Sequence, residues 1–558
     1  MGSHFGVVQP IFTDFYELTM SYGYWKAGKA NDTATFELFF RKNPFNGEFT
    51  IFAGLQDCIE YLSSFKFTQY DIEYLQKIMP SNVDPDFFDY LLNIDTIGLS
   101  LWSVEECSVV FPKVPIMQVE GPIVLCQLIE STLLNLVNYA SLMTTNAARY
   151  RLACGPTKKL YEFGLRRAQG PDGALSASKY AYLGGYDGTS NVLAGKMYGI
   201  PVVGTHAHSF VSAFQATRVE AEDKHVSDFE KFKKETVSQG DHLLDLRCQP
   251  MKLNEFLKRC WHWSICLSHL LKYQSDQIHP GELNAFANYA IAFPTRFLGL
   301  LDTYDVLKSG LPNFCAVALA LYEFGHQAIG IRVDSGDVAY LSLKIRNTFQ
   351  LISSHYKLPW FTQLQILVSN DLNEDTLHSF NQQDHSIDAF CVGTNLVTCQ
   401  KQPALGCVYK LVEINGTPTM KLSANFEKLT MPGKKVVYRL YSQEGEALLD
   451  LMKRPHENIP GVNERILCRH PTQASKRVFV VPGRVEKLLK LYWNGGKLVR
   501  PLQTLNEARQ RALDELNTLR SDYKRMVKPT QYKVSVSDEL YQFTQELWLS
   551  ITPIGEIS

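Results

Sequence analysis

Charged and hydroxyl side chains are concentrated in the segment Ile331–Asp337, which reads Ile-Arg-Val-Asp-Ser-Gly-Asp. Arg332 can bind a phosphate or a carboxylate through two parallel hydrogen bonds. Asp334 and Asp337 can hold ribose hydroxyl groups or a Mg²⁺ ion. Backbone N–H groups of the Ser-Gly pair between them can face an anion at a helix start. The alternative is a structural helix N-cap with an internal Arg–Asp pair.

A second segment, Gly204–Ser209, reads Gly-Thr-His-Ala-His-Ser and has two histidines two positions apart. On a strand both rings would lie on one face, whereas in a turn only one of them need reach a pocket. Two histidines without a third ligand make a poor zinc site. A single nucleophilic or acid–base histidine is therefore the more economical interpretation, with a polar loop as the alternative.

Two further segments carry groups suited to small anions. Gly164–Gly170 has adjacent arginines, Arg166 and Arg167, between glycines, which suits a diphosphate; a solvated basic turn is the alternative. Cys391–Asn395 ends a predicted strand in a Gly-Thr pair, where a close backbone approach and a hydroxyl suit a phosphate. An ordinary turn is the alternative there.

The 12 cysteines are scattered, mostly in apolar runs, which is typical of small buried side chains in a cytosolic protein. Cys260, His262, Cys266 and His269 lack the spacing of structural zinc fingers and lie in an apolar segment. We predict a core helix there.

The segment Thr13–Met20 predicts the start of a helix. Thr13 or Asp14 would be its N-cap, and Glu17 is placed for a capping box. This local explanation suffices, although a tyrosine at this place could also reach an aromatic ligand, including one across a dimer interface.

The elements that must position these groups alternate between strand and helix over roughly residues 150–400. Short β-branched runs end in small or polar residues, and helical stretches follow, as at 313–324, 338–349 and 373–380. This alternation predicts a parallel sheet covered on both faces, with its chemistry at the carboxyl ends of the strands. An irregular (β/α) barrel is the expected fold class, and an open doubly wound sheet is the alternative. The predicted strands are 200–203, 297–301, 328–333, 364–368 and 387–392, and further strand ends are expected near 163–167 and 186–190.

The flanks have a different texture, with mixed helix and strand before the barrel and a strand-rich stretch after it. We expect residues 1–115 and 401–558 to form a second α+β domain together, with the barrel, 116–400, inserted between them. Residues 215–280 interrupt the strand–helix rhythm and are interpreted as an insertion, partly exposed, with a charged run followed by helices.

Composition limits the classes of function. The chain has 558 residues, 45% of them apolar, which excludes global disorder. Lys and Arg total 56 and Asp and Glu total 57, a net charge of −1, which argues against a nucleic-acid or membrane-surface partner. We find no signal peptide and no membrane span, and expect a cytosolic enzyme.

Taken together, these segments resemble the nicotinate phosphoribosyltransferase family. The resemblance runs in family order over about residues 8–450. Besides the motifs above, it includes Glu37–Arg41, Asn146–Arg149, Leu183–Gly195, Leu301–Tyr304 and Leu311–Asn313. Residues 215–280 and the far C-terminus depart most from the family pattern.

The resemblance implies an irregular α/β barrel with a second domain and a homodimer with active sites at the interface. It also implies the reaction of nicotinate with 5-phosphoribosyl 1-diphosphate, which gives nicotinate mononucleotide and diphosphate. ATP hydrolysis is coupled to this step towards NAD. Mg²⁺, or Mn²⁺ in its place, is the implied metal, and ATP is the co-substrate.

The resemblance also implies roles for individual residues. His208 matches the histidine that ATP phosphorylates. Tyr16, from the other subunit, matches the residue that stacks on the pyridine ring, and Phe163 could supply the opposite face. The remaining implied contacts are Thr205 and Arg332 for nicotinate, Gly393 and Thr394 for phosphate, Asp334 for ribose, Arg166 for diphosphate, and Asp302 and Asp337 for Mg²⁺ or ribose.

Two other readings stay open. Nicotinamide or quinolinate phosphoribosyltransferase would share the barrel and the Asp-Ser-Gly-Asp strand, although the two arginines and the Gly-Thr-His-Ala-His-Ser segment favour the acid substrate by resemblance. A catalytically silent metabolite-binding homologue would be expected to lack the catalytic positions, yet His208, Arg332, Asp334 and Thr394 are all present.

Overall fold

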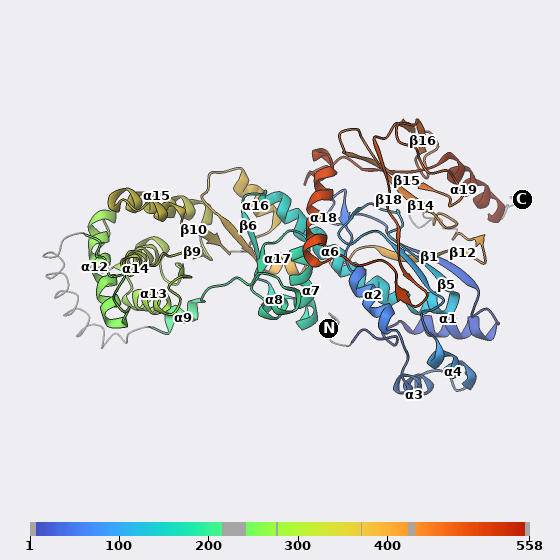
Figure 1. Ribbon diagram of the computed structural model, residues 1–558, viewed down its shortest axis with the longest axis horizontal. Helices are drawn as coiled ribbons and strands as arrows, with labels where there is room; N and C mark the ends of the chain where they lie inside the picture. The colour runs from blue at the N-terminus through green and yellow to red at the C-terminus, as the bar shows by residue number, and fades with distance from the viewer. Residues whose placement is uncertain (1–6, 215–241, 275–276, 370, 422–429, 553–558) are drawn as a thin grey trace, which may run out of the picture. The chain divides into compact units, whose positions relative to one another are not determined.

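A computed structural model describes residues 7–214, 242–274, 277–369, 371–421 and 430–552 (Figure 1). Backbone contacts divide the chain into two compact units. Unit 1 comprises Met1–Ala148, Gln169–Gly185 and Thr398–Ser558, and unit 2 comprises Arg149–Ala168 and Tyr186–Val397. The chain is a mixed α/β protein.

Unit 2 is built on a six-stranded sheet in the order β7-β6-β11-β10-β9-β8, with every pair parallel. Parallel strands covered on both faces need apolar residues at nearly every position, and β11 is buried throughout. The strands are β6 (Lys159–Glu162), β7 (Gly188–Thr189), β8 (Leu298–Leu300), β9 (Gly330–Val333), β10 (Gln365–Val368) and β11 (Ala389–Val392).

Helices follow the strands of unit 2, as the alternating pattern predicts. Asp337 and Asn373 begin two of them, because each side chain accepts a backbone N–H of the first turn. The helices are α8 (Val192–Tyr198), α9 (His208–Ser212), α12 (Leu253–Leu271), α13 (Pro280–Ala292), α14 (Leu311–Glu323), α15 (Val338–Tyr356), α16 (Glu374–Asn381) and α17 (Thr394–Val397), with short 3₁₀ turns at Leu165–Arg167 and Pro359–Gln363 and a π-helical turn at Val306–Gly310.

One predicted strand, at residues 200–203, is wrong. Only a single parallel bridge, between Val202 and Thr189, forms there. Pro201 has no N–H to donate to a ladder, and this segment lies at the outer edge of β7, so regular pairing does not extend along it. Among the described residues, no backbone pairing joins this edge to β8 at the other side of the sheet.

The predicted insertion, 215–280, lies partly outside the described residues, which omit 215–241 and 275–276. The predicted helix in it is confirmed as α12, whose apolar side, including Cys260 and Trp263, is buried and packs against α14 (Figure 1). His262 and Cys266 lie one helical turn apart, with Nε2 and Sγ 3.6 Å from each other. Nowhere in the described ranges do three or more His, Cys, Asp or Glu residues form a group that could hold a metal ion.

Unit 1 contains a seven-stranded sheet, a six-stranded sheet and a two-stranded ribbon. In the first sheet, β1 lies between β5 and β12, so strands from both ends of the chain pair in one layer. The strands are β1 (Thr33–Phe40), β2 (Thr50–Ile51), β3 (Ser100–Ser103), β4 (Val109–Val110), β5 (Met117–Pro122), β12 (Cys407–Ile414), β13 (Thr417–Pro418), β14 (Val436–Tyr441), β15 (Ala447–Lys453), β16 (Ile466–Arg469), β17 (Arg477–Val480), β18 (Arg484–Lys487), β19 (Lys490–Asn494), β20 (Lys497–Leu498) and β21 (Lys533–Val536).

The helices of unit 1 begin at conventional capping residues in several places. Thr68 and Thr504 form complete capping boxes with Asp71 and Glu507. The helices are α1 (Phe15–Lys26), α2 (Leu55–Ser64), α3 (Gln69–Ile78), α4 (Pro85–Asn93), α5 (Ile123–Leu128), α6 (Glu130–Cys154), α7 (Gly170–Leu183), α18 (Leu505–Thr518) and α19 (Asp538–Ile551), with a 3₁₀ turn at Ser521–Lys524.

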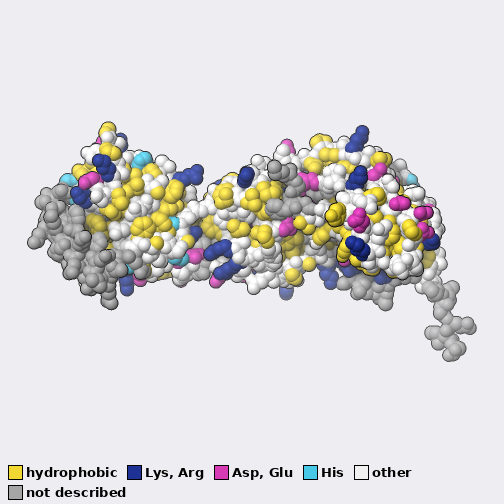
Figure 2. Space-filling view, turned by 90° about the horizontal axis from the view of Figure 1, so that it is seen from below, with side chains coloured by type: hydrophobic (Ala, Val, Ile, Leu, Met, Phe, Trp, Pro, Cys, Tyr) yellow, Lys and Arg dark blue, Asp and Glu magenta, His cyan; other side chains and the backbone are white. Residues whose placement is uncertain are grey.

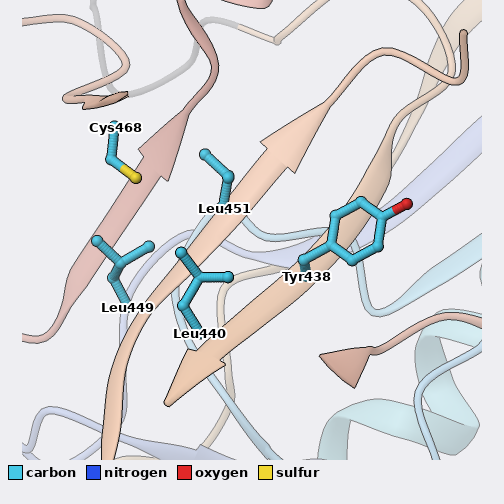
Figure 3. Packing of buried hydrophobic residues seen from close by; sticks show 5 residues of the cluster. All are labelled: Tyr438, Leu440, Leu449, Leu451 and Cys468. Atoms are coloured by element: carbon cyan, nitrogen blue, oxygen red, sulfur yellow. The ribbon is translucent and has the colours of Figure 1, made fainter. Parts of the chain in front are cut away.

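The six-stranded sheet of unit 1 has a compact apolar cluster (Figure 3). Tyr438 and Leu440 are two positions apart on β14, and they pair with Leu451 and Leu449 on β15. Because side chains two positions apart lie on one face of a strand, all four lie on the same face, and Cys468 of β16 joins them.

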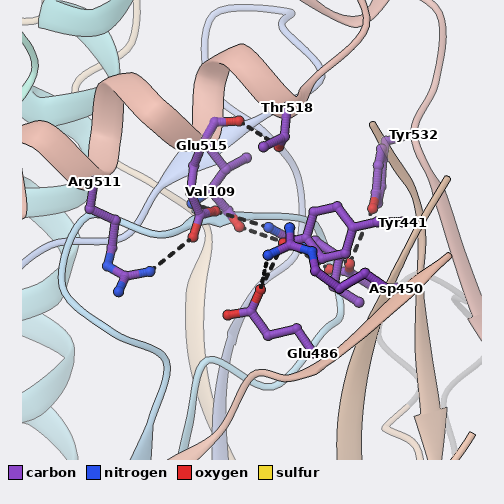
Figure 4. A network of polar contacts seen from close by, with 10 residues as sticks. Val109, Tyr441, Asp450, Glu486, Arg511, Glu515, Thr518 and Tyr532 are labelled. Carbon is purple, nitrogen blue, oxygen red and sulfur yellow. Dashed lines mark hydrogen bonds and ion pairs between the residues drawn. The ribbon is translucent and has the colours of Figure 1, made fainter. Parts of the chain in front are cut away.

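A buried arginine of β14, Arg439, joins this sheet to its neighbours in unit 1. Figure 4 labels its partners Val109, Asp450 and Glu515. The Arg439 guanidinium donates to both Asp450 oxygens, at 2.7 and 2.9 Å, to Glu515 at 3.0 Å and to the Val109 carbonyl at 2.7 Å. Two carboxylates and a carbonyl satisfy the buried charge, so β14, β15, α18 and β4 are held together by one side chain.

In the part of the chain that the structure describes, one helical stretch, Ile123–Cys154, is long and apolar enough to cross a membrane by length and composition. However, 67% of its most apolar window is buried inside the structure, and it begins in the midst of unit 1 beside β5 and α1. Burial of this kind is typical of a core helix.

The surface and the cysteines agree with the composition. On the face seen in Figure 2, Lys and Arg side chains are scattered, with Asp and Glu side chains between them. Nine of the 12 cysteines are buried, and all are free thiols. The prediction that most of them fill the core is confirmed.

Candidate active site

A pocket of about 290 Å³ opens in unit 2 at the carboxyl ends of four parallel strands, β6, β9, β10 and β11. Polar groups gather there because the last residue of each strand and the turn after it leave the buried sheet at the same edge. The pocket is lined by Phe163, Gly164, Arg166, Arg167, Arg332, Asp334, Ser369, Asp371, Leu372, Cys391, Gly393, Thr394 and Asn395.

Arg332, on β9, is held from two sides. Its Nη2 donates to the His206 carbonyl at 3.2 Å, and the guanidinium carbon lies 6.0 Å from the centre of the Phe163 ring. Its buried Nε has no hydrogen-bond partner among the described residues. An unsatisfied buried donor favours an additional acceptor, such as a carboxylate or phosphate oxygen.

Arg166 and Arg167 both line the pocket, in the 3₁₀ turn that follows β6. Arg167 donates to the Thr394 hydroxyl at 3.1 Å, so the two arginines and the Gly393-Thr394 turn share one wall. A Cβ at Gly164 would lie 2.3 Å from a methyl group of Val397, so only glycine lets this turn approach α17. These groups can bind a small anion.

Asp334 and Asp302 are linked through backbone and hydroxyl groups. The Asp334 N–H and the Ser335 hydroxyl donate to one Asp302 oxygen, at 3.2 and 2.6 Å. The other Asp302 oxygen is buried and has no hydrogen-bond partner in the described part of the chain. Ser369 donates to Asp334 at 2.5 Å, which orients that carboxylate from β10.

His208, the first residue of α9, lies beside both carboxylates and is not part of the pocket lining. Its Nε2 is 3.9 Å from Asp302 Oδ1 and 3.9 Å from Asp334 Oδ2, and its Nδ1 shares a hydrogen bond with the Thr303 hydroxyl at 3.1 Å. The side chain is 43% exposed. An accessible imidazole oriented by a hydroxyl and flanked by carboxylates can act as a nucleophile or an acid–base group.

The other histidine of the segment has a different environment. His206 is buried among Phe210, Phe286 and Tyr289, and its Nε2 accepts the Leu300 N–H at 3.3 Å. Burial lowers the pKa of His206 to about 4, so the ring is neutral. Thr205 donates to the His206 carbonyl at 3.2 Å.

The remaining predicted residues lie elsewhere. Asp337 is the N-cap of α15, and its Oδ1 accepts the Tyr340 N–H at 3.0 Å. Tyr16 belongs to α1 of unit 1, where its side chain is exposed. The predicted capping box at Glu17 is wrong, because its carboxylate bonds Ser131 of α6 and not the N-cap backbone of its own helix.

Several site residues were absent from the residue-level predictions. Ser369, Thr303 and Asn395 stand one to three positions after predicted strands, so their positions were available signals. Their partners, Asp334 for Ser369, His208 for Thr303 and the Leu372 carbonyl for Asn395, are 23 to 95 residues away in sequence, and no local pattern identifies them.

Comparison with known proteins identifies relatives over the whole chain. Three family models match: the nicotinate phosphoribosyltransferase N-terminal domain at residues 11–138, the nicotinate phosphoribosyltransferase family at 158–261, and the C-terminal domain at 434–544. The chain is 50% identical to nicotinate phosphoribosyltransferase of Caenorhabditis elegans, over 100% of this chain and 96% of the relative. It is 42% identical to that of Homo sapiens, over 98% of each.

Solved structures agree with these relatives. The crystal structure of human nicotinic acid phosphoribosyltransferase matches with a TM-score of 0.82 at 39% identity, over 96% of this chain and 99% of that one. A nicotinate-nucleotide pyrophosphorylase from Pyrococcus furiosus matches with a TM-score of 0.56 at 18% identity, over 91% and 95%, which shows a shared fold alone.

Proposed function

Because this chain belongs to the nicotinate phosphoribosyltransferase family, we propose that it joins nicotinate to 5-phosphoribosyl 1-diphosphate at the strand-end pocket of unit 2. The observation that carries this function is the identity of 42–50% with nicotinate phosphoribosyltransferases over almost the full length of both chains. The pocket adds a chemical reason, because guanidinium groups, carboxylates and hydroxyls converge there.

Each chemical group of the two substrates has a suitable partner in or beside the pocket. The guanidinium of Arg332 suits the nicotinate carboxylate, next to the Phe163 ring, and Thr205 is the second proposed contact. Arg166 and Arg167 suit the diphosphate, and the Gly393-Thr394 turn suits the 5-phosphate. Asp334 suits the ribose hydroxyls. Tyr16 is proposed to stack on the pyridine ring.

The reaction needs little covalent help from the protein. The C1–O bond to diphosphate breaks, the diphosphate leaves with the electron pair, and the ring nitrogen forms the new bond to C1. Arg166 stabilises the negative charge on the leaving group. Arg332, Phe163 and Tyr16 orient the nitrogen.

We propose that His208 accepts the γ-phosphoryl group of ATP. A neutral imidazole nitrogen forms the N–P bond, and the P–O bond to ADP breaks. The Thr303 hydroxyl lies 3.1 Å from Nδ1, so it can hold the ring proton there and leave Nε2, beside Asp302 and Asp334, as the attacking nitrogen. The phosphohistidine then couples ATP hydrolysis to product formation.

The residues fit a Mg²⁺ ion. Asp302 offers a buried carboxylate oxygen without a hydrogen-bond partner among the described residues, and Mg²⁺ typically takes one or two carboxylates together with substrate phosphates. Asp337 has only one oxygen left, since the other caps α15. When bound, the ion would neutralise charge on the diphosphate, and Mn²⁺ could take its place.

We extend the proposal to architecture and assembly. The Thr189–Val202 bridge adds the segment around residue 202 to the β7 edge of the sheet, and the His206 ring in the same segment accepts an N–H of β8 at the opposite edge. These two contacts support an irregular barrel that is closed by the His206 side chain. The pairing of β1 with β12 supports a second domain made from both chain ends, 1–115 and 401–558, with the barrel, 116–400, between them. We also propose that two copies of the chain form a homodimer whose active sites are shared between the subunits, and that the protein is cytosolic.

The decisive experiment measures nicotinate mononucleotide formation from nicotinate and 5-phosphoribosyl 1-diphosphate, with and without ATP. We expect product without ATP and faster turnover with it. His208→Ala should retain the slow reaction and lose ATP stimulation. Label from γ-³²P-ATP should appear on the wild-type protein and be absent from the variant.

His269→Ala is the matched control, because this histidine lies exposed at the end of α12 in the same unit. It should keep full ATP stimulation. Parallel assays with nicotinamide and quinolinate test the alternative substrates, and faster turnover of either would reject nicotinate as the substrate. Absence of product from all three would favour a catalytically silent homologue.

A further inference from the structure

The loop and first turn of α1 around Tyr16 are attached to the start of α6 through one serine of unit 1. Ser131 is the second residue of α6, and its hydroxyl lies 2.6 Å from Glu17 Oε1 and 2.8 Å from Asp14 Oδ2. The Ser131 N–H also donates to Glu17 Oε1 at 2.9 Å. Glu17 thus caps a helix that begins 113 residues later in the chain.

Tyr16 takes part in the same arrangement. Glu130 and Ser131, the first two residues of α6, interact with Tyr16, while 46% of the residue remains exposed. Tyr16 therefore lies beside the start of α6, and its ring is accessible to a ligand. Thr132 continues the attachment by donating to the Phe12 carbonyl at 2.5 Å.

The number of protons available around Ser131 indicates that one of its two carboxylate neighbours is protonated. Its hydroxyl has one proton but two carboxylates within hydrogen-bond distance. If both were ionised, one of them would face a hydroxyl lone pair. A proton on Glu17 removes this conflict, because Glu17 then donates to Ser131 and Ser131 donates to Asp14. Thr13 donates to the other Glu17 oxygen.

The surroundings favour this protonated form. Glu17 is fully buried, and the described residues include no ion pair to it. Burial is the largest cause that raises the pKa of Glu17 to about 7. The charged and titratable groups around the cluster are Asp14 and Tyr16 on its own segment, Glu130 on α6, Lys410 and Tyr409 on β12, Tyr61 on α2 and Tyr24 on α1.

We propose that Glu17 and Ser131 are positioning residues for Tyr16. The Glu17 carboxyl fastens the Tyr16 turn to the first turn of α6, and this attachment sets the direction in which the aromatic ring faces nicotinate. The inference rests on the proposed function, since it assumes that the ring of Tyr16 contacts nicotinate. Neither residue touches a substrate.

The test compares KM for nicotinate with KM for 5-phosphoribosyl 1-diphosphate in four variants of the full chain. Tyr16→Ala should raise the KM for nicotinate about 30-fold, and Glu17→Ala about 10-fold, with the other KM changed less than about threefold. Ser131→Ala keeps the backbone bond and should give a smaller rise in the same direction. Glu73→Gln, exposed on α3, is the control and should match the wild type.

The conservative variant Glu17→Gln separates positioning from simple structural damage. Glutamine keeps the shape and is neutral at every pH, so its KM for nicotinate should equal that of the wild type at pH 6. The wild-type KM should rise between pH 6 and pH 8 as Glu17 ionises, and the ratio of variant to wild type should fall. Thermal unfolding of each variant shows whether it is folded.

The outcomes are distinguishable. If Tyr16→Ala leaves the KM for nicotinate unchanged, the proposed role of Tyr16 fails. If Tyr16→Ala raises it but folded Glu17→Ala and Ser131→Ala do not, only the positioning inference is overturned. An equal rise of both KM values in Glu17→Ala would also overturn it. If Glu17→Ala does not fold, Ser131→Ala and the pH profile of Glu17→Gln decide.

Discussion

At the scale of single residues, the site separates two histidines that are two positions apart. His208 is accessible and lies beside two carboxylates, whereas His206 is buried and neutral with its Nε2 on a strand N–H. The segment leaves the sheet edge without forming a regular strand, so the two rings do not share a face. One histidine is available for chemistry, and the other positions the segment.

Arg332→Lys is expected to raise the KM for nicotinate about 10- to 100-fold, with kcat reduced less. Lysine keeps the charge but cannot bond the His206 carbonyl and a carboxylate with a planar fork. Steady-state kinetics with nicotinate as the varied substrate measure the change. Arg296→Lys, outside the pocket, is the control. An unchanged KM would exclude Arg332 as the nicotinate contact.

His206 predicts a pH-dependent stability. Its folded pKa of about 4 lies below its ordinary value of 6.5, so between these values the unfolded chain binds more protons than the folded one. The contribution is complete above pH 6.5 and is lost as the pH falls towards 4, about 3 kcal/mol in all. We expect the free energy of unfolding of the wild type to fall relative to that of His206→Gln between pH 7 and pH 5, in urea titrations. His269→Gln should show no such difference, and parallel curves for wild type and His206→Gln would contradict the prediction.

At the scale of elements, the parallel strands β9 and β10 of unit 2 approach each other closely at their amino ends, opposite to the edge that forms the pocket. Gly330 begins β9, and a Cβ there would lie 2.1 Å from the Gln365 carbonyl oxygen on β10. Backbone cannot move aside without breaking the pairing that carries Arg332 and Asp334 to the pocket. This glycine is therefore required by packing between strands.

Gly330→Ala is expected to lower the free energy of unfolding by about 3 kcal/mol, because the new methyl group forces β9 and β10 apart. Gly204→Ala is the control, since its Cβ would meet no heavy atom within 4 Å; it should change stability by less than about 1 kcal/mol. Denaturant unfolding monitors both. Equal stabilities for the two variants would show that the strands adapt.

At the scale of the whole molecule, the proposed ring of Tyr16 belongs to unit 1 and the pocket belongs to unit 2. If sites are shared between subunits, two variants that are each impaired at nicotinate concentrations below the KM of Tyr16→Ala can complement each other. Co-expressed Tyr16→Ala and His208→Ala chains form mixed dimers in which one site has both native residues, and about a quarter of the ATP-stimulated activity should return. Sedimentation should show a dimer. No recovery from mixed dimers would place both residues in one chain's site.

The alternation of strands and helices, and the polar residues at strand ends, could be predicted because they depend on local patterns. Arg332 lies in a buried strand, Asp334 and Thr394 follow buried strands, and parallel strands bring their carboxyl ends to one edge. The resemblance added the family, which the relatives confirm. Boundaries were less predictable where composition was ambiguous, as at residues 200–203, where a proline and an edge position left a single bridge.

The sequence by itself determined which groups are available and which strand end each follows, since both depend on neighbours along the chain. Only the tertiary structure decided their partners: Glu17 with Ser131, His206 with Leu300, and Arg332 with the His206 carbonyl, pairs separated by 94 to 126 residues. In the sequence, Glu17 has the spacing of a capping box for its own helix. In the fold, the first N–H groups of α6 have no partner inside α6, and the N–H of Ser131 donates to the Glu17 carboxylate. The stronger contact is the one made in the buried site, and no local pattern contains it.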